Sequence, residues 1–291
     1  MSVEDSYEWL DYRTRQRFWD IVEGPVGIHL VLALSVLIVL APLLWEVLTS
    51  LKTDEAVYNL SVLPRDPTFS SYYNVLIEQK YWRAMVNSII ISTTTTAIVL
   101  TLAVPAGYAF SRFRFPFDTA LFIGVLFSRL FPPIGLIIPY YRIMSSLDLL
   151  NTLPGVIIAQ VYLWLPLMVY IVRSVFISIP QELGESARVD GCTHLQAFRH
   201  VVLPLARPGL AACGILTFLY SWREFLFSLI VTRTLAAQPI SVAVYRFVGD
   251  VSVAWASLAA ACVLAIIPTV LVVLTFQRYI VSGLTAGALK Q

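Results

Sequence analysis

Charged side chains are scarce in this sequence of 291 residues: Asp, Glu, Lys and Arg make up 13% of it, whereas hydrophobic residues make up 58%. A soluble globular domain carries about 25% charged residues. The composition therefore excludes a soluble enzyme domain, a disordered chain and a nucleic-acid-binding protein. The net charge of +2 is too small to indicate binding to a polyanion. A polytopic membrane protein remains.

Metal-ligating and catalytic patterns are also missing. Cys192, Cys213 and Cys262 lie far apart and form no C-x-x-C pair, so neither a disulfide framework nor a zinc site is expected. No apolar run contains His, Asp or Ser residues at catalytic spacing, which argues against a membrane-embedded enzyme. We expect no catalytic residue, no metal and no bound cofactor in this chain.

A phosphate-binding loop of the form G-x-x-x-x-G-K-[ST] is absent as well, because the sequence contains no Gly-Lys pair. The chain therefore cannot be an ATPase by itself. An energised transporter built on it needs a separate subunit that supplies the energy.

Long apolar runs, in contrast, are abundant. A membrane-spanning helix needs about 20 mostly apolar residues. Six segments meet this requirement: 28–51, 87–110, 119–140, 154–177, 208–232 and 253–276. Their apolar residues are continuous rather than alternating, which is typical of helices and not of a β-barrel. We expect an all-α membrane protein with six transmembrane helices over residues 28–280, an N-terminal segment 1–27 and a C-terminal tail 281–291.

The basic residues of the short loops indicate the orientation of these helices. With the N-terminus inside, eleven Lys and Arg residues fall on the inner side and seven on the outer side. We expect a multi-pass protein of the cell membrane with both termini in the cytoplasm. Segment 1–27 is then cytoplasmic and forms either a helix at the headgroup level or a disordered segment.

The segment 178–207, between the fourth and fifth predicted spans, is long for an inner loop. Pro180 suits the first position of a helix, and Gly191 suits the left-handed residue that ends one. Ile179, Leu183 and Ala187 would share one stripe of this helix. Such a stripe could dock into a groove on another protein or lie back on its own bundle, and the spacing leaves both open.

A second short helix is expected after this turn. Thr193 and Gln196 have the spacing of a capping box, in which each residue satisfies a backbone N–H of the other. Pro204 and Pro208 are expected to end this helix before the fifth span. The segment 178–207 is therefore predicted to be a rigid helix–turn–helix that projects into the cytoplasm.

The same segment resembles the EAA loop of the permease subunits of ABC importers, whose pattern is E-A-A, three residues, G, nine residues, I, one residue, L-P. The matching positions are Glu185, Ser186, Ala187, Asp190, Gly191, Val201, Leu203 and Pro204, with Ser186 and Val201 as small departures. The resemblance implies that this loop is a coupling helix, which inserts into a cleft on a separate ATPase subunit.

Further segments resemble the maltose-type carbohydrate permeases, among them 108–114, 222–227 and the tail 277–290. The resemblance covers residues 28–291. It implies the type I (MetI-like) permease fold, a second homologous permease, two copies of an ATPase that uses ATP and Mg, and an extracytoplasmic solute-binding protein. The tail residues Gly283, Thr285 and Gly287 would contact the ATPase.

The substrate implied by this resemblance is a sugar, either a disaccharide or an oligosaccharide. Arg223 stands where Asn is usual in this family, which leaves glycerol phosphate or a polyol as an alternative substrate. An ion-coupled secondary transporter is a further alternative, but Glu224 is the only acidic residue deep in a predicted span. The outer docking face would consist of segment 52–83 and the loops 141–153 and 233–252.

Polar and aromatic side chains inside the spans are candidates for the translocation pathway. They are Arg129, Phe131, Pro132, Tyr140, Trp164, Tyr220, Trp222 and Glu224. A charge in mid-membrane needs a partner or a wet cavity, so Arg129 and Glu224 either form a structural ion pair or contact the substrate. The Pro132–Pro133 pair is expected to break the third span. Aromatic rings can stack on sugars, although an interfacial aromatic belt explains these rings equally well.

Overall fold

The computed structural model describes residues 24–59, 61–249 and 253–285, so most of the predicted N-terminal segment and residues 286–291 of the tail lie outside the description. Within these ranges the regular elements are helices. They are α2 (Pro25–Ser50), α3 (Asp54–Val57), α4 (Ser70–Tyr73), η1 (Asn74–Glu78), α5 (Tyr81–Arg112), α6 (Asp118–Phe127), η2 (Pro133–Leu136), α7 (Ile137–Ser146), α8 (Leu153–Ile177), α9 (Gln181–Val189), α10 (His194–Ala197), η3 (Phe198–Val202), α11 (Leu203–Trp222), α12 (Leu226–Val231), α13 (Ile240–Ala243), η4 (Val244–Phe247) and α14 (Trp255–Thr285).

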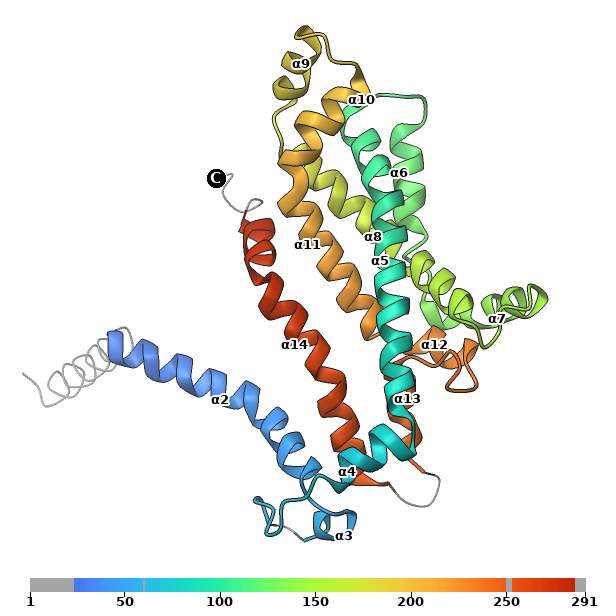
Figure 1. Ribbon diagram of the computed structural model, residues 1–291. Coiled ribbons are helices and arrows are strands. Elements are labelled where there is room, and N and C mark those ends of the chain that lie inside the picture. Colours follow the sequence, from blue (N-terminus) through green and yellow to red (C-terminus); the bar gives the residue numbers. More distant parts are fainter. Residues whose placement is uncertain (1–23, 60, 250–252, 286–291) are drawn as a thin grey trace, which may run out of the picture.

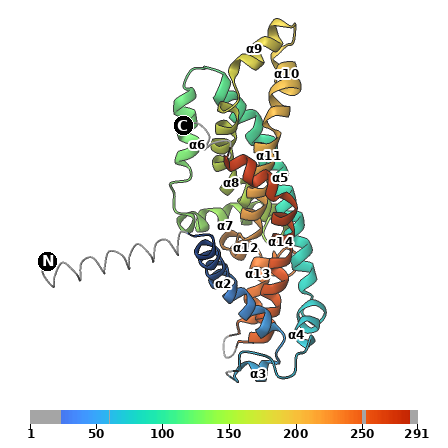
Figure 2. The same cartoon turned by 90° about the vertical axis from the view of Figure 1, so that its left-hand side faces the viewer.

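Five of the described helices are long and apolar enough to cross a membrane: α2, α5, α8, the continuous run from α10 to α11, and α14. They correspond to the first, second, fourth, fifth and sixth predicted spans. Figures 1 and 2 place α9 and α10 at one end of this bundle and α3 and α4 at the opposite end.

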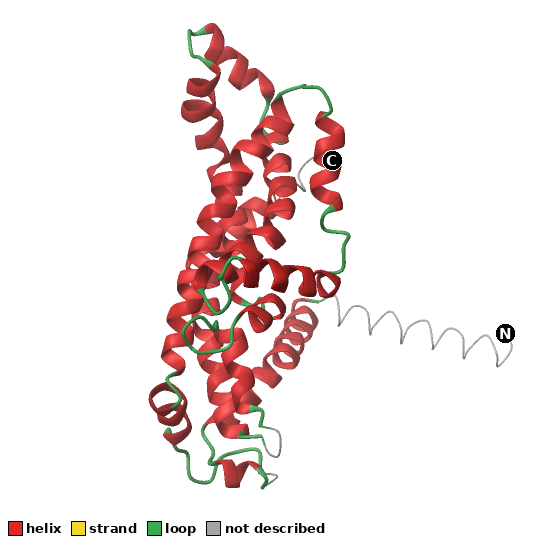
Figure 3. Ribbon diagram, turned by 90° about the vertical axis from the view of Figure 1, so that its right-hand side faces the viewer, coloured by secondary structure: helices red, strands yellow, loops and turns green. Residues whose placement is uncertain are grey.

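The third predicted span, 119–140, is divided into separate helices, and the break expected at the Pro132–Pro133 pair is confirmed. The helix α6 has ten residues, which span about 15 Å, or half the hydrocarbon thickness. A turn follows, and α7 then lies across the bundle at mid-height (Figures 1 and 3). The cause is the Pro132–Pro133 pair: Pro132 is extended, with ψ of 126°, and neither ring nitrogen can donate a helical hydrogen bond.

The fifth predicted span also differs at both ends. Pro204 and Pro208 do not end a helix, because the helix is continuous from His194 to Trp222. A π-helical turn, η3, widens the helix directly before Pro204, and Leu203 N–H bonds to Phe198 O instead of a carbonyl four residues back. At its other end, α11 stops at Trp222 and the short helix α12 follows after a turn.

The core of the molecule is the packing of α5, α8 and α11. A Cβ atom on Gly107 of α5 would lie 2.7 Å from Val172 Cγ1 and 2.9 Å from the backbone nitrogen of Arg173 on α8, so only glycine permits this close approach. Buried residues of the three helices, including Val99, Met168 and Cys213, form one cluster there.

The first helix is different, because α2 leans away from this core and packs mainly against α14 (Figure 1). Along most of its length its apolar side chains are exposed. Only 6% of its most apolar window is buried inside the chain. A hydrophobic surface of this size is stable in contact with lipid or with another membrane subunit.

Candidate functional site

The helix pair α9 and α10 extends beyond the end of the bundle (Figure 1). The tight turn between the two helices is built on Gly191, which has φ of +91°, a value that L-residues rarely adopt. Cys192 N–H donates to Ala187 O at 3.0 Å, and Gly191 N–H donates to Arg188 O at 3.1 Å, which satisfies carbonyls at the end of α9.

The predicted start of the second helix is confirmed. Gln196 N–H donates to the Thr193 hydroxyl at 3.3 Å, and Thr193 N–H donates to Gln196 Oε1 at 2.8 Å. Both bonds of the capping box are therefore formed. Together with Gly191 they fix the direction in which the chain leaves the tip and returns to the bundle.

The stripe of Ile179, Leu183 and Ala187 does not act as one docking surface. Ala187 is buried and Ile179 is half-buried, both within this chain, whereas Leu183 is exposed. The most exposed large apolar residues of α9 and α10 are instead Val189 and Leu195, which are 88% and 71% exposed. The tip therefore carries an exposed apolar surface that periodicity did not identify.

The other residues of the EAA-like pattern divide in the same way. Glu185, Ser186, Asp190 and Gly191 are exposed around the tip. Leu203 and Pro204 lie half-buried at the start of α11. Exposed positions are therefore concentrated in the first part of the pattern, while its last part connects the tip to the membrane-spanning helix.

A clamp that sequence reasoning missed holds the base of this helix pair. Arg112, the last residue of α5, donates from Nη2 to Phe176 O at 3.0 Å and to Ile179 O at 2.6 Å. These carbonyls lie at and just beyond the end of α8, and Phe176 O also accepts from Ile179 N–H at 3.3 Å. Arg112 thus ties two transmembrane helices together directly before α9 begins.

Aromatic rings extend this clamp to the second helix of the pair. The Tyr108 ring of α5 lies 5.3 Å from the Phe176 ring and 4.4 Å from the Phe198 ring, measured between centroids. On the neighbouring turn of α8, Arg173 Nε donates to Phe110 O at 3.1 Å, and its guanidinium lies 4.6 Å from the Phe122 ring of α6. These contacts join the base of the α9–α10 tip to α5, α6 and α8.

Three of the eight pathway candidates lie in one stack in the middle of the bundle. The rings of Trp164 on α8 and Tyr220 on α11 are stacked, with centroids 4.8 Å apart and planes 17° from parallel. The Arg129 guanidinium lies 5.3 Å from the Trp164 ring, and its Nη1 donates to Leu163 O at 2.6 Å. At the other end the Arg223 guanidinium lies 4.9 Å from the Tyr220 ring. We call these four residues the cation–aromatic stack.

The proposed ion pair between Arg129 and Glu224 is not formed. The Glu224 carboxylate is buried and accepts bonds from Phe227 N–H at 2.8 Å, Ser228 N–H at 3.1 Å and Ser228 Oγ at 2.6 Å. Glu224 therefore caps the N-terminus of α12, where the helix dipole favours a negative charge. A local cap satisfies this carboxylate without the arginine.

The remaining candidates have separate places. Trp222 is buried, donates from Nε1 to Ala265 O at 3.1 Å and faces α14. Tyr140 donates to Gly155 O at 2.7 Å and packs on Phe227. Phe131 and Pro132 are exposed at the break after α6, where Phe131 and Arg129 line a cavity of about 150 Å³.

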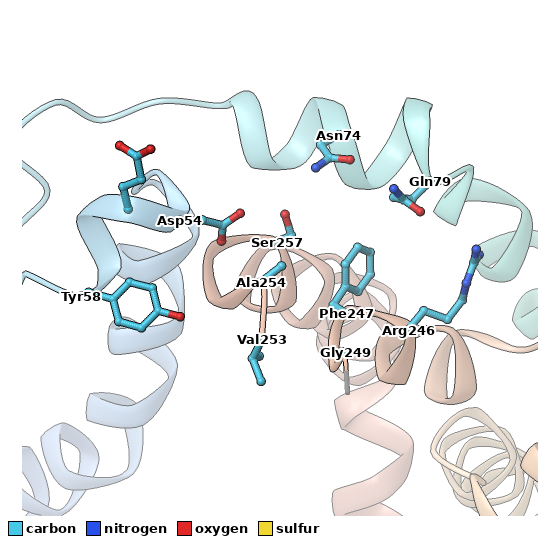
Figure 4. A pocket seen from close by; sticks show the side chains of 11 residues that line it. Asp54, Tyr58, Asn74, Gln79, Arg246, Phe247, Gly249, Val253, Ala254 and Ser257 are labelled. Carbon is cyan, nitrogen blue, oxygen red and sulfur yellow. The ribbon is translucent and has the colours of Figure 1, made fainter. Parts of the chain in front are cut away.

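The opposite end of the molecule carries a polar pocket of about 530 Å³, shown in Figure 4. Segments far apart in sequence form it: Asp54 comes from α3 and Tyr58 directly follows α3, Asn74 comes from η1 and Gln79 directly follows η1, and Arg246 comes from η4. Asp54 Oδ1 accepts from Ala256 N–H at 3.0 Å and so joins α3 to the start of α14.

The three segments of the expected outer docking face are not at one level. Residues within 54–58, 74–79, 246–249 and 253–257 line this pocket. The loop after α7 lies at mid-height instead, where Asn151 binds Thr234 through both side chains at 2.9 Å (Figure 1). Of the tail residues expected to contact an ATPase, Gly283 and Thr285 belong to the last turn of α14, and Gly287 lies outside the described ranges.

Comparison with known proteins identifies the family that has this architecture. The family model described as the binding-protein-dependent transport system inner membrane component matches residues 100–286, which include α9, α10 and the cation–aromatic stack. The chain belongs to this family. It is a transport subunit of an importer whose ATP hydrolysis is carried out by a separate ATPase, and the expectation of an ABC importer permease is confirmed.

Individual permeases of the family are similar over nearly the whole chain. The trehalose transport system permease protein SugB of Mycobacterium tuberculosis is 38% identical over 253 residues, covering 86% of this chain and 92% of that protein. The sulfoquinovosyl glycerol transport system permease protein SmoH of Agrobacterium fabrum is 34% identical over 263 residues, covering 89% and 92%. A crystal structure of a bacterial ABC transporter that imports the acidic polysaccharide alginate contains a chain that matches with a TM-score of 0.77 and 26% identity, covering 89% of this chain and 97% of that one.

Proposed function

We propose that this permease forms half of the translocation pathway of an ATP-driven, binding-protein-dependent importer of disaccharides or oligosaccharides. The observation that carries the proposal is the α9–α10 helix pair, which projects from the bundle with an exposed apolar tip and lies within the family match. The substrate class follows the relatives, whose printed names and titles refer to trehalose, a sulfoquinovosyl glycerol and alginate.

In this proposal the α9–α10 end is cytoplasmic and docks into a cleft on one of two ATPase copies, which use ATP and Mg. When the ATPase pair closes, the tip moves as a rigid body, because Arg112 and the Tyr108 ring tie it to α5 and α8. The three helices of the core then rock together and change the side on which the pathway opens.

Each of the other partners is proposed to contact a different exposed surface of the chain. The apolar face of α2 has few contacts within the chain and suits a second, homologous permease or the lipid around the pair. The α3–α4 end is outside, and its polar pocket (Figure 4) suits contact with the extracytoplasmic solute-binding protein that the family requires. The tail after α14 would reach the ATPase pair from the cytoplasmic side.

The docking proposal is tested by placing charge on the apolar tip. In the double variant Val189→Glu, Leu195→Glu both changes are at exposed positions, so the fold should persist while the ATPase no longer co-purifies with the permease. The matched control is Val62→Glu, Leu63→Glu, which alters a Val and a Leu that are also exposed (58% and 67%) near the opposite end and should keep the ATPase. Full assembly of the tip variant would refute docking at α9–α10.

Transport itself is measured with the assembled importer in liposomes. Uptake of trehalose or a longer saccharide should require ATP on the α9 side and the binding protein on the α3 side. Sugar uptake that continues without ATP would instead support the ion-coupled secondary transporter.

A further inference from the structure

We infer that the cation–aromatic stack binds a negatively charged group of the substrate, so that the transported sugar is anionic. The inference rests on the proposed function, because it assumes that a saccharide passes this part of the chain. It concerns Arg129, Trp164, Tyr220 and Arg223, which come from the ends of α6 and α11 and from the middle of α8.

The first step is the position of the two arginines. Arg129 lies two residues after the end of α6, and Arg223 directly follows the end of α11. Both helices stop at mid-height in the bundle, close to α7 and α12 (Figures 1 and 3). A charged side chain at this depth is costly in hydrocarbon and is normally found facing a water-filled cavity or a partner group.

The second step is that neither charge is neutralised within the described chain. The described ranges contain one ion pair within 4 Å, between Arg114 and Asp118 near the start of α6. Glu224, which directly follows Arg223 in sequence, uses its carboxylate to cap α12. The guanidinium groups of Arg129 and Arg223 each lie over an aromatic ring, and both residues are exposed.

The third step is what the stack leaves available to a ligand. The Trp164 and Tyr220 rings each cover one face of the other. These rings therefore position the two arginines and leave little free ring face for stacking on a sugar. A guanidinium has five N–H donors, and Arg129 uses one on Leu163 O. The remaining donors suit the paired oxygens of a carboxylate, sulfonate or phosphate.

The geometry thus favours a sugar that carries one of these anions over a neutral sugar. A neutral saccharide would pass two uncompensated cations without a partner for either. An anionic one would neutralise them while its hydroxyl groups bind elsewhere along the pathway.

The test uses the complete importer in liposomes with four probes: trehalose, its monouronate, its 6-sulfonate and its 6-phosphate. The variants are the double substitution Arg129→Gln, Arg223→Gln and the matched control Arg83→Gln. Arg83 is also exposed and lies 5.5 Å from the ring of Trp82, but at the α3 end of α5. ATP-dependent uptake and co-purification of the second permease and the ATPase are measured for each.

We expect wild-type protein to take up at least one anionic probe ten-fold faster than trehalose. The double variant should lose this preference at least ten-fold with the complex intact, because uptake of the anionic probe falls more than uptake of trehalose. Arg83→Gln should change neither the preference nor the complex. Equal loss for all probes, loss of the complex, or loss of a co-purifying phospholipid with uptake unchanged would overturn the inference. A wild-type preference for trehalose that the double variant retains would also overturn it and leave the importer function standing. Absence of ATP-dependent uptake of every probe would refute the proposed function instead.

Discussion

Two pairs of arginines in this permease differ in the groups that their N–H donors reach. Arg112 and Arg173, at the α9 end, donate to backbone carbonyls of neighbouring helices. Arg129 and Arg223, at mid-height, lie on ring faces and remain exposed, with one bond from Arg129 to a backbone carbonyl. The first pair joins neighbouring helices, and the second pair carries exposed positive charge that a ligand can reach. The same residue type therefore has a structural use in one region and an available charge in the other.

The largest effect that would test this contrast is expected for Arg112→Gln. Its two bonds to Phe176 O and Ile179 O are charge-assisted and partly buried, and such bonds contribute about 1.5–3 kcal/mol each. We expect the free energy of unfolding to fall by about 3 kcal/mol and ATPase-driven transport to be lost. Unfolding of the purified protein in detergent and uptake in liposomes measure the two quantities. Stability equal to that of Arg129→Gln would remove the contrast.

A smaller effect is expected for Glu224→Gln. The amide keeps one acceptor oxygen but loses the charge at the N-terminus of α12, so the unfolding free energy should fall by about 1–2 kcal/mol. In a double-mutant cycle with Arg129→Gln the interaction energy should be below about 0.5 kcal/mol, because the two side chains do not pair. A coupling of 2 kcal/mol or more would restore the ion pair expected from sequence.

Loss of the cap at the tip should have a smaller effect still. Thr193→Ala removes the hydroxyl that accepts from Gln196 N–H, and loss of a helix cap typically costs about 1 kcal/mol. We expect faster hydrogen exchange in 193–202 with little change in the transmembrane helices. Thr193→Ser, which keeps the hydroxyl, should restore wild-type protection. Uniform loss of protection across the bundle would show that the tip is not an independent unit.

The smallest change in stability is expected for Arg223→Gln. An exposed arginine on a ring face contributes little to folding, so the unfolding free energy should change by less than about 0.5 kcal/mol. The effect should fall on uptake of an anionic probe instead. A loss of stability close to that of Arg112→Gln would show that both arginine pairs are structural.

Helix ends, caps and breaks were predicted correctly where residues close in sequence determine them. Gly191 ends α9 with a positive φ, and Thr193 with Gln196 forms both bonds of the capping box. The Pro132–Pro133 pair breaks the third predicted span, although the sequence alone did not show that α7 then turns across the bundle. These features depend on backbone conformations and hydrogen bonds that reach only a few residues along the chain.

Pro204 shows where such reasoning fails. A proline is expected to end a helix because it has no N–H to donate. Here the π-helical turn η3 precedes Pro204, and the helix continues into α11. Ala187 shows a second failure, because helical periodicity identified an apolar stripe but not which side of α9 faces the rest of the chain. The clamp of Arg112 had no signal beyond an arginine at the end of an apolar segment followed by aromatic residues.

Hydrophobicity, segment length and residue spacing were enough to predict a helical membrane protein with a projecting helix pair, and the resemblance to the EAA loop implied that it is a permease. Folding in three dimensions decided the rest: which arginines bind backbone and which stay exposed, that Glu224 caps a helix, and that α2 stands apart from the core. The physical reason is the distance along the chain between the residues that interact. The apolar length of a helix and its capping depend on residues close in sequence. Arg112, in contrast, reaches Phe176 and Ile179, and Trp164 reaches Tyr220, across dozens of residues that only the packing of α5, α8 and α11 brings together.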